Sequence, residues 1–518
     1  MNKRITRLAM VLGVLYLLLF AQLNRVQFFG AQRLKDNPIN SRGLIREFGQ
    51  ERGQILAADG VVLARSVPSE GSFHNVRQYP EGELFAHITG YQSLNVGATG
   101  LEREYNDELA GSKIEQQIST IGDLFRRRNT TGTLTLTISD RVQRVARDAL
   151  GDRRGSVVAV DPRNGDILAL WTWPSFDPNP LASTDGAAAN QAYEDLLSDP
   201  SDPLLAKSFR ELFFPGSTFK LVTATAALGT GLVTATSPVL PDSNSYQPIP
   251  AGRPISNFAG ETCGGNLVED LRVSCNTAFA EFGAEWVGPE AMINTAEAYG
   301  FNRVPPIDLP AAAASKFPTD YGERLADVQY YRGDSEAGED APLALPNGSV
   351  DIYENSARLA QASIGQNDVA ATPLQMAMVA AGIANDGVVM SPHVVSSVTG
   401  ADGRVYSTSE PQIWRVASSR AIAQTMRNAM ITVAESGTAT RLAIPGYVVG
   451  GKTGTAQLGT SPPNSHAWIV GFAGPSDGPA EVAVAVIVEA QDGASEQTGG
   501  RVAAPIAKSV MEAILGVG

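Results

Sequence analysis

The sequence is poor in the side chains that most metal and redox sites need. It has two cysteines, Cys263 and Cys275, and four widely separated histidines among 518 residues. A disulfide-rich scaffold, an iron–sulfur cluster and a multi-cysteine zinc site are therefore excluded. No HExxH or HxxEH pattern occurs either. We expect neither a metal site nor a cofactor.

Positive charge is also scarce. Lys and Arg number 40 against 54 Asp and Glu, which gives a net charge of −14. The longest basic run is Arg126 to Arg128, and so short a run is typical of a solvated turn. Because an acidic surface repels phosphate backbones, nucleic acid is not an expected partner. The 43% of hydrophobic residues indicates a chain that folds.

One uncharged, largely apolar segment lies near the N-terminus. Three basic residues precede residues 8–23, and Arg25 follows them. The segment is slightly short for a membrane span, but basic side chains at its ends extend the usable length. A cleaved signal peptide is the alternative, and it would need a small-x-small cleavage site that is missing here. We predict a cytoplasmic tail at residues 1–7 and a single transmembrane anchor at residues 8–25.

The rest of the chain divides near residue 150. Residues 30–150 are polar and turn-rich, which predicts an extended β-rich module. Residues 151–518 have strand patterns at both ends and helical patterns between them. We therefore predict an α+β domain, in which one antiparallel sheet is completed by the two ends of the domain and flanked by helices. The expected strands span residues 156–160, 166–171, 447–450, 467–472 and 481–489, and the expected helices span residues 217–228, 277–287, 372–384 and 505–515.

One of these helices carries a Ser-x-x-Lys pattern. Its residues after Ser217 are apolar nearly all round, which predicts a central, buried helix. Burial and the positive end of the helix both disfavour charge on Lys220, so its amine is pushed toward the neutral form that accepts a proton. Ser217 lies three residues earlier on the same face. The simpler alternative is that Ser217 caps the helix while Lys220 reaches water.

Two further patterns follow along the chain. Ser274 and Asn276 form a Ser-x-Asn pattern between two helical segments, where helix capping is the simpler explanation. Lys452 opens a Lys-Thr-Gly-Thr sequence on an expected strand. It would supply the second cation that a neutral Lys220 requires, and its charge with the neighbouring threonine hydroxyls would form a receptor for a carboxylate.

The third pattern has a rival interpretation. Residues 446–453 match GxxxxGK[ST], the phosphate-binding loop. That loop must lead into a helix, whereas the residues after 453 are rich in glycine and proline and favour a strand and a turn. We therefore do not expect a nucleotide site.

Ser-x-x-Lys, Ser-x-Asn and Lys-Thr-Gly occur in this order in penicillin-binding proteins and class A β-lactamases. The chain resembles a class B penicillin-binding protein, a monofunctional peptidoglycan D,D-transpeptidase, and most of all the actinobacterial penicillin-binding protein A subgroup. Segments outside the three motifs share the resemblance, among them Arg52-Gly53, Gly100-Leu101-Glu102, Asp161-Pro162, Ser363-Ile364-Gly365-Gln366 and His466-Ala467-Trp468.

The resemblance implies a penicillin-binding, serine β-lactamase-like transpeptidase domain after a membrane-proximal, dimerisation or pedestal-like module at residues 30–150. It implies an oxyanion hole made by the backbone N–H groups of Ser217 and Thr455. It also implies a set of functional side chains. The catalytic ones are Ser217 as nucleophile, Lys220 as base, Ser274, Asn276 and Lys452, and the substrate-binding ones are Thr453, Gly454 and Thr455.

The resemblance further implies partners and a location. The substrates would be peptidoglycan stem peptides, and β-lactam antibiotics would acylate the same serine. A polytopic membrane glycosyltransferase and proteins of cell division or elongation would be partners. The catalytic domain would lie on the outer face of a bacterial plasma membrane, held by one transmembrane helix.

Several alternatives stay open at this point. A D,D-carboxypeptidase differs only in using water as acceptor, and a non-catalytic scaffold would bind partners through residues 30–150. A class A β-lactamase would need a deacylating glutamate in an ExxLN sequence, which is absent. Cys263 and Cys275 are either joined in a disulfide beside the Ser-x-Asn pattern or present as two free thiols.

Overall fold

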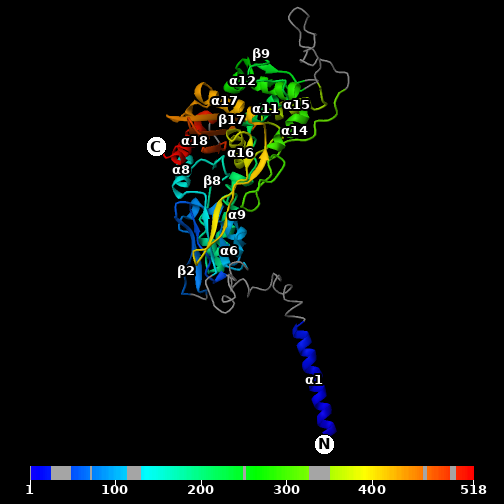
Figure 1. Ribbon diagram of the computed structural model, residues 1–518, viewed down its shortest axis with the longest axis vertical. Coiled ribbons are helices and arrows are strands. Elements are labelled where there is room, and N and C mark those ends of the chain that lie inside the picture. Colours follow the sequence, from blue (N-terminus) through cyan, green and yellow to red (C-terminus); the bar gives the residue numbers. More distant parts are fainter. Residues whose placement is uncertain are drawn as a thin grey trace, which may run out of the picture.

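The computed structural model describes residues 2–24, 48–70, 73–113, 130–248, 252–325, 351–458, 464–490 and 497–517. Figure 1 shows two bodies in contact, with helices α11, α16 and α18 in the upper one and strand β2 and helix α6 (Asn106–Ala110) in the lower one. Residues 30–47 and 114–129 of the expected N-terminal module lie outside the described residues.

The upper body is built on a five-stranded antiparallel sheet in the order β17-β18-β19-β7-β8. Strand β19 is almost pure Val, Ala and Ile, and it pairs with β7, for example Val486 opposite Val157. The late strands thereby join the early pair, which confirms the predicted sheet made by the two ends of the domain. The strands are β7 (Gly155–Val160), β8 (Ile167–Trp173), β17 (Tyr447–Gln457), β18 (Ser465–Pro475) and β19 (Val482–Val488).

Helices cover this sheet and bury it. All seven residues of β19 are buried, so both faces of the strand are covered. Helices α16 (Pro373–Ala384) and α18 (Gly499–Leu515) both pack on β18 and β19, and α8 (Asp140–Leu150) packs on β8 and α18. Helix α11 (Lys220–Gly229) is buried over nearly its whole length, as its apolar sequence predicts.

Two predicted helices differ from the structure. The segment expected at residues 277–287 is an α-helix, α13 (Asn276–Glu281), followed by a π-helical segment, η7 (Phe282–Val287). The helix expected at residues 505–515 begins at Gly499, with Pro505 inside it. An interior proline lowers helix propensity, but the close packing of the first turn against β17 and β18 overrides that local preference.

The lower body shares a sheet with the upper one. Its six strands lie in the order β15-β14-β6-β1-β2-β3. Strands β14 and β15 come from the sequence after residue 390, whereas the other four lie before residue 140. Strand β14 pairs antiparallel with β6, so a non-local strand pairing joins the two bodies. The strands are β1 (Ile55–Leu56), β2 (Val62–Pro68), β3 (Asn75–Gln78), β6 (Gly132–Leu136), β14 (Val395–Gly400) and β15 (Val405–Thr408).

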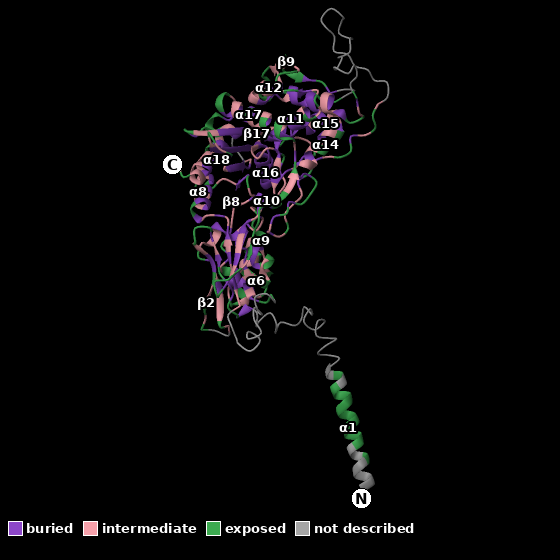
Figure 2. Cartoon of the chain, viewed as in Figure 1, coloured by how far each residue is buried: buried purple, intermediate pink, exposed green. Residues whose placement is uncertain are grey.

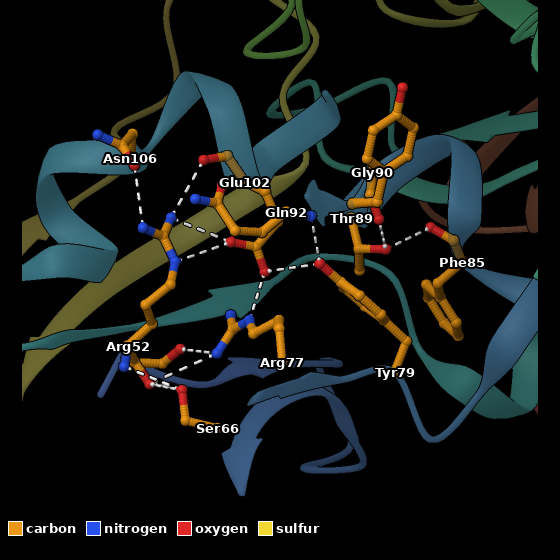
Figure 3. Close-up of polar contacts among 12 residues, drawn as sticks. Arg52, Ser66, Arg77, Tyr79, Phe85, Thr89, Gly90, Gln92, Glu102 and Asn106 are labelled. Atoms are coloured by element: carbon orange, nitrogen blue, oxygen red, sulfur yellow. Dashed lines mark hydrogen bonds and ion pairs between the residues drawn. The ribbon is translucent and has the colours of Figure 1, made fainter. Parts of the chain in front are cut away.

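A buried ionic network holds the lower body together (Figure 3). Arg52 Nε and Arg77 Nε donate to the two carboxylate oxygens of Glu102 at 3.1 and 2.6 Å. Glu102 has no exposed surface, and it belongs to helix α5 (Gly100–Glu104). Burying a carboxylate is costly unless its charge and hydrogen bonds are matched, and the two guanidinium groups provide that match.

Helix α1 (Asn2–Asn24) contains most of the segment in which we expected a membrane anchor at residues 8–25; Arg25 lies outside the described residues. Its large hydrophobic side chains from Met10 to Phe20 are exposed (Figure 2). No helix in the described ranges is long and apolar enough to cross a membrane. The predicted transmembrane helix is therefore not confirmed.

Candidate active site

Ser217 lies where the chain enters the buried helix α11. It belongs to a short 3-10 turn, η5 (Gly216–Phe219), that runs directly into Lys220. Gly216 has φ of 52°, and a Cβ atom there would meet the carbonyl oxygen of Thr455 at 3.0 Å. Glycine is therefore needed for this turn to approach strand β17. Ser217 is half-buried and lines a cleft of about 990 Å³.

Lys220 lies completely inside the protein. Its Nζ donates to the Ser274 carbonyl at 2.7 Å and to Asn276 Oδ1 at 2.6 Å, and it lies 3.4 Å from Ser274 Oγ. Burial, and next the positive charge of Lys452, hold the pKa of Lys220 well below its usual value. The structure thus confirms that Lys220 is buried, as the Ser-x-x-Lys helix predicts.

The Ser-x-Asn pattern forms a corner between two helices. Ser274 ends helix α12 (Leu267–Val273) with φ of 64° and ψ of 43°, and Asn276 begins α13. The left-handed conformation of Ser274 reverses the chain direction at this corner. As a result the Ser274 hydroxyl and the Asn276 carboxamide both face Lys220.

Two features hold this corner in place. The Oδ1 atom of Asn257 accepts the backbone N–H groups of Asn276 and Thr277 at 2.9 and 3.0 Å. A disulfide joins Cys263 to Cys275, with 5.9 Å between their Cα atoms, which settles the alternative left open by the sequence. Asn257 was not predicted, since it precedes the motif by about twenty residues and no local pattern marks it.

Lys452 connects the third motif to the second. It lies on β17 without exposed surface, and its Nζ donates to Ser274 Oγ at 2.7 Å and to the Thr453 carbonyl at 2.9 Å. Burial lowers its pKa to about 7. The hydroxyl of Ser274 therefore lies between the two lysine amines. Lys452 thus lies beside Lys220 as the sequence predicts, and its charge lowers the pKa of Lys220.

The rest of the Lys-Thr-Gly-Thr sequence faces the cleft or the turn that carries Ser217. Thr453 and Thr455 line the cleft, and Thr453 Oγ1 donates to Thr438 Oγ1 at 2.7 Å. A Cβ atom on Gly454 would lie 3.0 Å from the Pro215 carbonyl oxygen, so glycine permits the strand to pass close to the turn. All of residues 447–457 pair with β18 as one strand. This geometry lacks the loop and helix that the phosphate-binding alternative requires.

The structure thus brings the predicted residues to one place. Lys220, Ser274, Asn276 and Lys452 share one hydrogen-bond network, and the predicted nucleophile lies on the wall of the same cleft. Within the described part of the chain, Ser217 Oγ makes no hydrogen bond to Lys220. Hydrogen bonds of this kind are often long in a free enzyme and shorten when substrate binds.

The fold and this site are those of a serine acyl-transfer protein, and comparison with known families agrees. The model of the penicillin binding protein transpeptidase domain matches residues 155–512, and that of the penicillin binding protein A dimerisation domain matches residues 52–134. The chain belongs to the penicillin-binding protein transpeptidase family. The class predicted from the three motifs is confirmed.

Particular relatives match over nearly the full length. The chain is 38% identical to the peptidoglycan D,D-transpeptidase PbpA of Mycolicibacterium smegmatis, over 99% of each chain, and 36% identical to that of Mycobacterium tuberculosis over the same shares. A solved structure of penicillin-binding protein A from M. tuberculosis, an imipenem acyl-enzyme complex, superposes with a TM-score of 0.76 at 36% identity. That comparison covers 90% of this chain and all of the other. The predicted resemblance to the penicillin-binding protein A subgroup is therefore confirmed.

Proposed function

We propose that the protein is a peptidoglycan D,D-transpeptidase that works through an acyl-enzyme on Ser217. Ser217 Oγ attacks the carbonyl between two D-alanines of a stem peptide while its proton passes to the neutral amine of Lys220. The C–N bond then breaks, the leaving D-alanine takes up a proton, and an ester to Ser217 remains. An amine of a neighbouring stem peptide attacks that ester, which forms the cross-link and frees the serine.

The other residues of the site have separate roles. Ser274 relays the proton toward the leaving amine, because its hydroxyl lies within reach of both lysine amines. Asn276 binds the substrate amide. Lys452, Thr453 and Thr455 hold the terminal carboxylate, and Gly454 keeps the strand close enough for the backbone N–H of Thr455 to join that of Ser217 in the oxyanion hole.

One observation supports this proposal above the others. Lys220 and Lys452 come from elements more than 200 residues apart in sequence, yet both amines contact the hydroxyl of Ser274. Burying two lysines against one serine is costly for a fold. The arrangement is useful when one amine must stay neutral and accept a proton.

The test is labelling with a fluorescent penicillin, compared between the wild-type protein and Ser217→Ala. We expect a stable label on the wild-type protein and none on the variant. A label that survives in the variant places the nucleophile elsewhere, and an unlabelled wild-type protein favours the scaffold alternative. Rapid loss of the label indicates a β-lactamase. Product analysis with a donor peptide and an added amine then separates cross-linking from D,D-carboxypeptidase activity.

The proposal extends to the organisation of the chain. Residues 30–150 serve as a membrane-proximal module, and residues 151–518 form the catalytic domain. The tail at residues 1–7 and the anchor at residues 8–25 attach the enzyme to the plasma membrane, with the catalytic domain on the outer face. A polytopic membrane glycosyltransferase of division or elongation supplies the strands to be cross-linked. Fractionation of the full chain and of a variant lacking residues 1–25 tests the attachment, since only the full chain should sediment with membranes.

A further inference from the structure

Asp270 is a buried acidic residue that the proposed reaction does not use. It lies on helix α12, four residues before Ser274, and has no exposed surface. Its backbone carbonyl accepts the N–H of Cys275 at 2.8 Å, so the residue supports the helix corner that carries Ser274 and Asn276. The backbone of Asp270 is therefore tied to the Ser-x-Asn corner, and its side chain is buried in the same helix, with Oδ1 on the side of Gly265.

The side chain of Asp270 lacks the partners that a buried carboxylate normally has. Neither oxygen makes a hydrogen bond among the residues described. Burying a carboxylate without hydrogen bonds costs free energy, so its ionised form must be stabilised by a nearby positive charge. Lys220 provides that charge, since each of the two side chains favours the ionised form of the other. Lys220 also donates a hydrogen bond to the carbonyl of Ser274, at the end of the helix that carries Asp270.

Besides Lys220, the charges that act most strongly on the Asp270 carboxyl are negative. Glu269 on the same helix, Glu281 on α13 and Asp242 on strand β9 (Leu240–Ser243) all disfavour its ionised form. Arg272, the positive residue of this helix, is paired with Glu269. Helix α17 (Arg420–Ser436) packs along α12 and carries three charged residues. Arg427 lies over the ring of Phe472, Arg420 is paired with Asp386, and Glu435 is exposed. Strand β12 (Cys263–Gly265), also packed on α12, contributes only the disulfide-bonded Cys263.

We propose that Asp270 is a positioning residue for Lys220, whose carboxylate stabilises the ammonium that forms when Ser217 gives up its proton. This inference rests on the proposed roles of Ser217 and Lys220. The proton moves from Ser217 Oγ to Lys220 Nζ, and no bond to Asp270 forms or breaks. A nearby negative charge makes the amine a stronger base, which offsets part of the effect of burial and of Lys452.

The pH dependence follows from the state of this carboxyl. Burial, the largest cause, raises the pKa of Asp270 to about 7, while the charge of Lys220 opposes the shift. Above that pH the group is ionised and supports the ammonium form of Lys220. As the pH falls through this range, Asp270 becomes protonated and the support is lost.

The experiment measures the rate constant for acylation by a fluorescent penicillin between pH 5 and 9. Asp270→Asn keeps the shape of the side chain but removes its charge, so the pKa of Lys220 falls further. We expect the acid limb of the profile to move to lower pH by about one unit, and the plateau to fall about 10-fold because the base is weaker. Asp270→Glu, which keeps the charge, should retain the wild-type limb.

Asp242→Asn is the matched control, since it makes the same charge change at an exposed position of the same acidic group. The acid limb of its pH profile should stay within about 0.3 pH units of that of the wild type. If Asp270→Asn fails to fold, Asp270→Ala, which leaves no buried amide, replaces it with the same expectation. A folded variant with an unmoved limb, or one moved to higher pH, overturns the inference. Failure of the wild-type protein to acquire a Ser217-dependent label overturns the proposed function instead.

Discussion

Two lysine amines lie within hydrogen-bonding distance of one serine hydroxyl, at 3.4 Å for Lys220 and 2.7 Å for Lys452. Both side chains are fully buried, and burial lowers the pKa of each. Two neighbouring charges also shift the pKa of Lys220, in opposite directions. The positive charge of Lys452 lowers this pKa, and the negative charge of Asp270 raises it. The basicity of Lys220, the proposed acceptor of the Ser217 proton, thus depends on two neighbours that can be changed separately.

Replacing Lys452 should shift the pH profile in the direction opposite to that of Asp270→Asn. Lys452→Met keeps an unbranched side chain but removes the positive charge, so the pKa of Lys220 rises. Lys220 then loses its proton only at higher pH. We expect the acid limb of penicillin acylation to move up by about one unit. The plateau should fall about 100-fold, because the carboxylate of the ligand loses its cation.

Lys316→Met is the control for this variant, because Lys316 is exposed and lies outside the cleft. It should leave both the limb and the plateau unchanged. A limb of Lys452→Met that stays in place or moves to lower pH would show that Lys452 does not set the pKa of Lys220.

The residues of the proposed catalytic centre could be predicted from the sequence, and the residues that hold them in place could not. Ser217, Lys220 and Lys452 stand in short patterns whose spacing reflects their proposed roles. Asn257 and Trp468 act through contacts to segments about twenty and more than 250 residues away. Such contacts depend on how the chain folds back on itself, and no local sequence pattern records them.

At the scale of elements, the turn before Ser217 is held from two sides. Phe213 exchanges backbone hydrogen bonds with Ala371 at 3.0 and 2.8 Å. On the other side, the indole N–H of Trp468 on β18 donates to the carbonyl of Phe214 at 3.0 Å. The position of Ser217 is therefore fixed to the central sheet and not only to its own helix.

Trp468→Phe should lower catalysis more than stability. It keeps an aromatic ring against Phe213 but removes the indole N–H that orients the turn. We expect penicillin acylation to slow about 10-fold, since small errors in the position of a nucleophile are costly. The free energy of unfolding should fall by about 1 kcal/mol, the value of one hydrogen bond. Stopped-flow labelling and urea unfolding measure the two effects.

Trp171→Phe provides a matched control in the same sheet. Trp171 on β8 is also buried, but its indole nitrogen has no hydrogen-bond partner in the described structure. Removing that N–H should leave the acylation rate unchanged. It breaks no hydrogen bond, so it should not lower the free energy of unfolding in that way. Equal slowing in both variants would mean that the ring, and not the hydrogen bond to Phe214, positions the turn.

The order of the elements was largely predictable, while their ends were not. The apolar run at residues 482–488 and the paired strands after Gly155 predict the central sheet because a fully buried strand has a simple signature. The start of α18 and the π-helical segment after Glu281 depend on packing partners. Local helix propensity cannot anticipate them.

For the whole molecule, the boundary that composition places near residue 150 does not separate the sheets. Strand β6 pairs with β14 across more than 250 residues of sequence, so the sheet of the lower body is completed by two strands, β14 and β15, from the second half of the chain. A strand pattern shows that a strand exists, but it does not identify the partner. The pairing could not be inferred from either segment alone.

The charge of the molecule is unevenly distributed, so the net charge of the chain does not describe the cleft. The chain has a net charge of −14, yet the cleft is lined by three exposed arginines and one exposed glutamate. The arginines are Arg253, Arg441 and Arg501, and the glutamate is Glu261. A positive cleft in an acidic protein draws anionic ligands toward it and raises their rate of association.

This local field makes a prediction about salt and charge. In Arg441→Glu/Arg501→Glu, two positive charges at the cleft become negative, so the approach of a penicillin carboxylate is no longer favoured. We expect the acylation rate constant at low ionic strength to fall about 10-fold and its decrease with added salt to disappear or reverse. Arg404→Glu, on the exposed turn between β14 and β15 and outside the cleft, makes the same kind of change elsewhere and should alter neither. If the wild type, the double variant and Arg404→Glu respond to salt alike, the arginines at the cleft do not guide the ligand. Its carboxylate is then recognised only after it reaches Lys452.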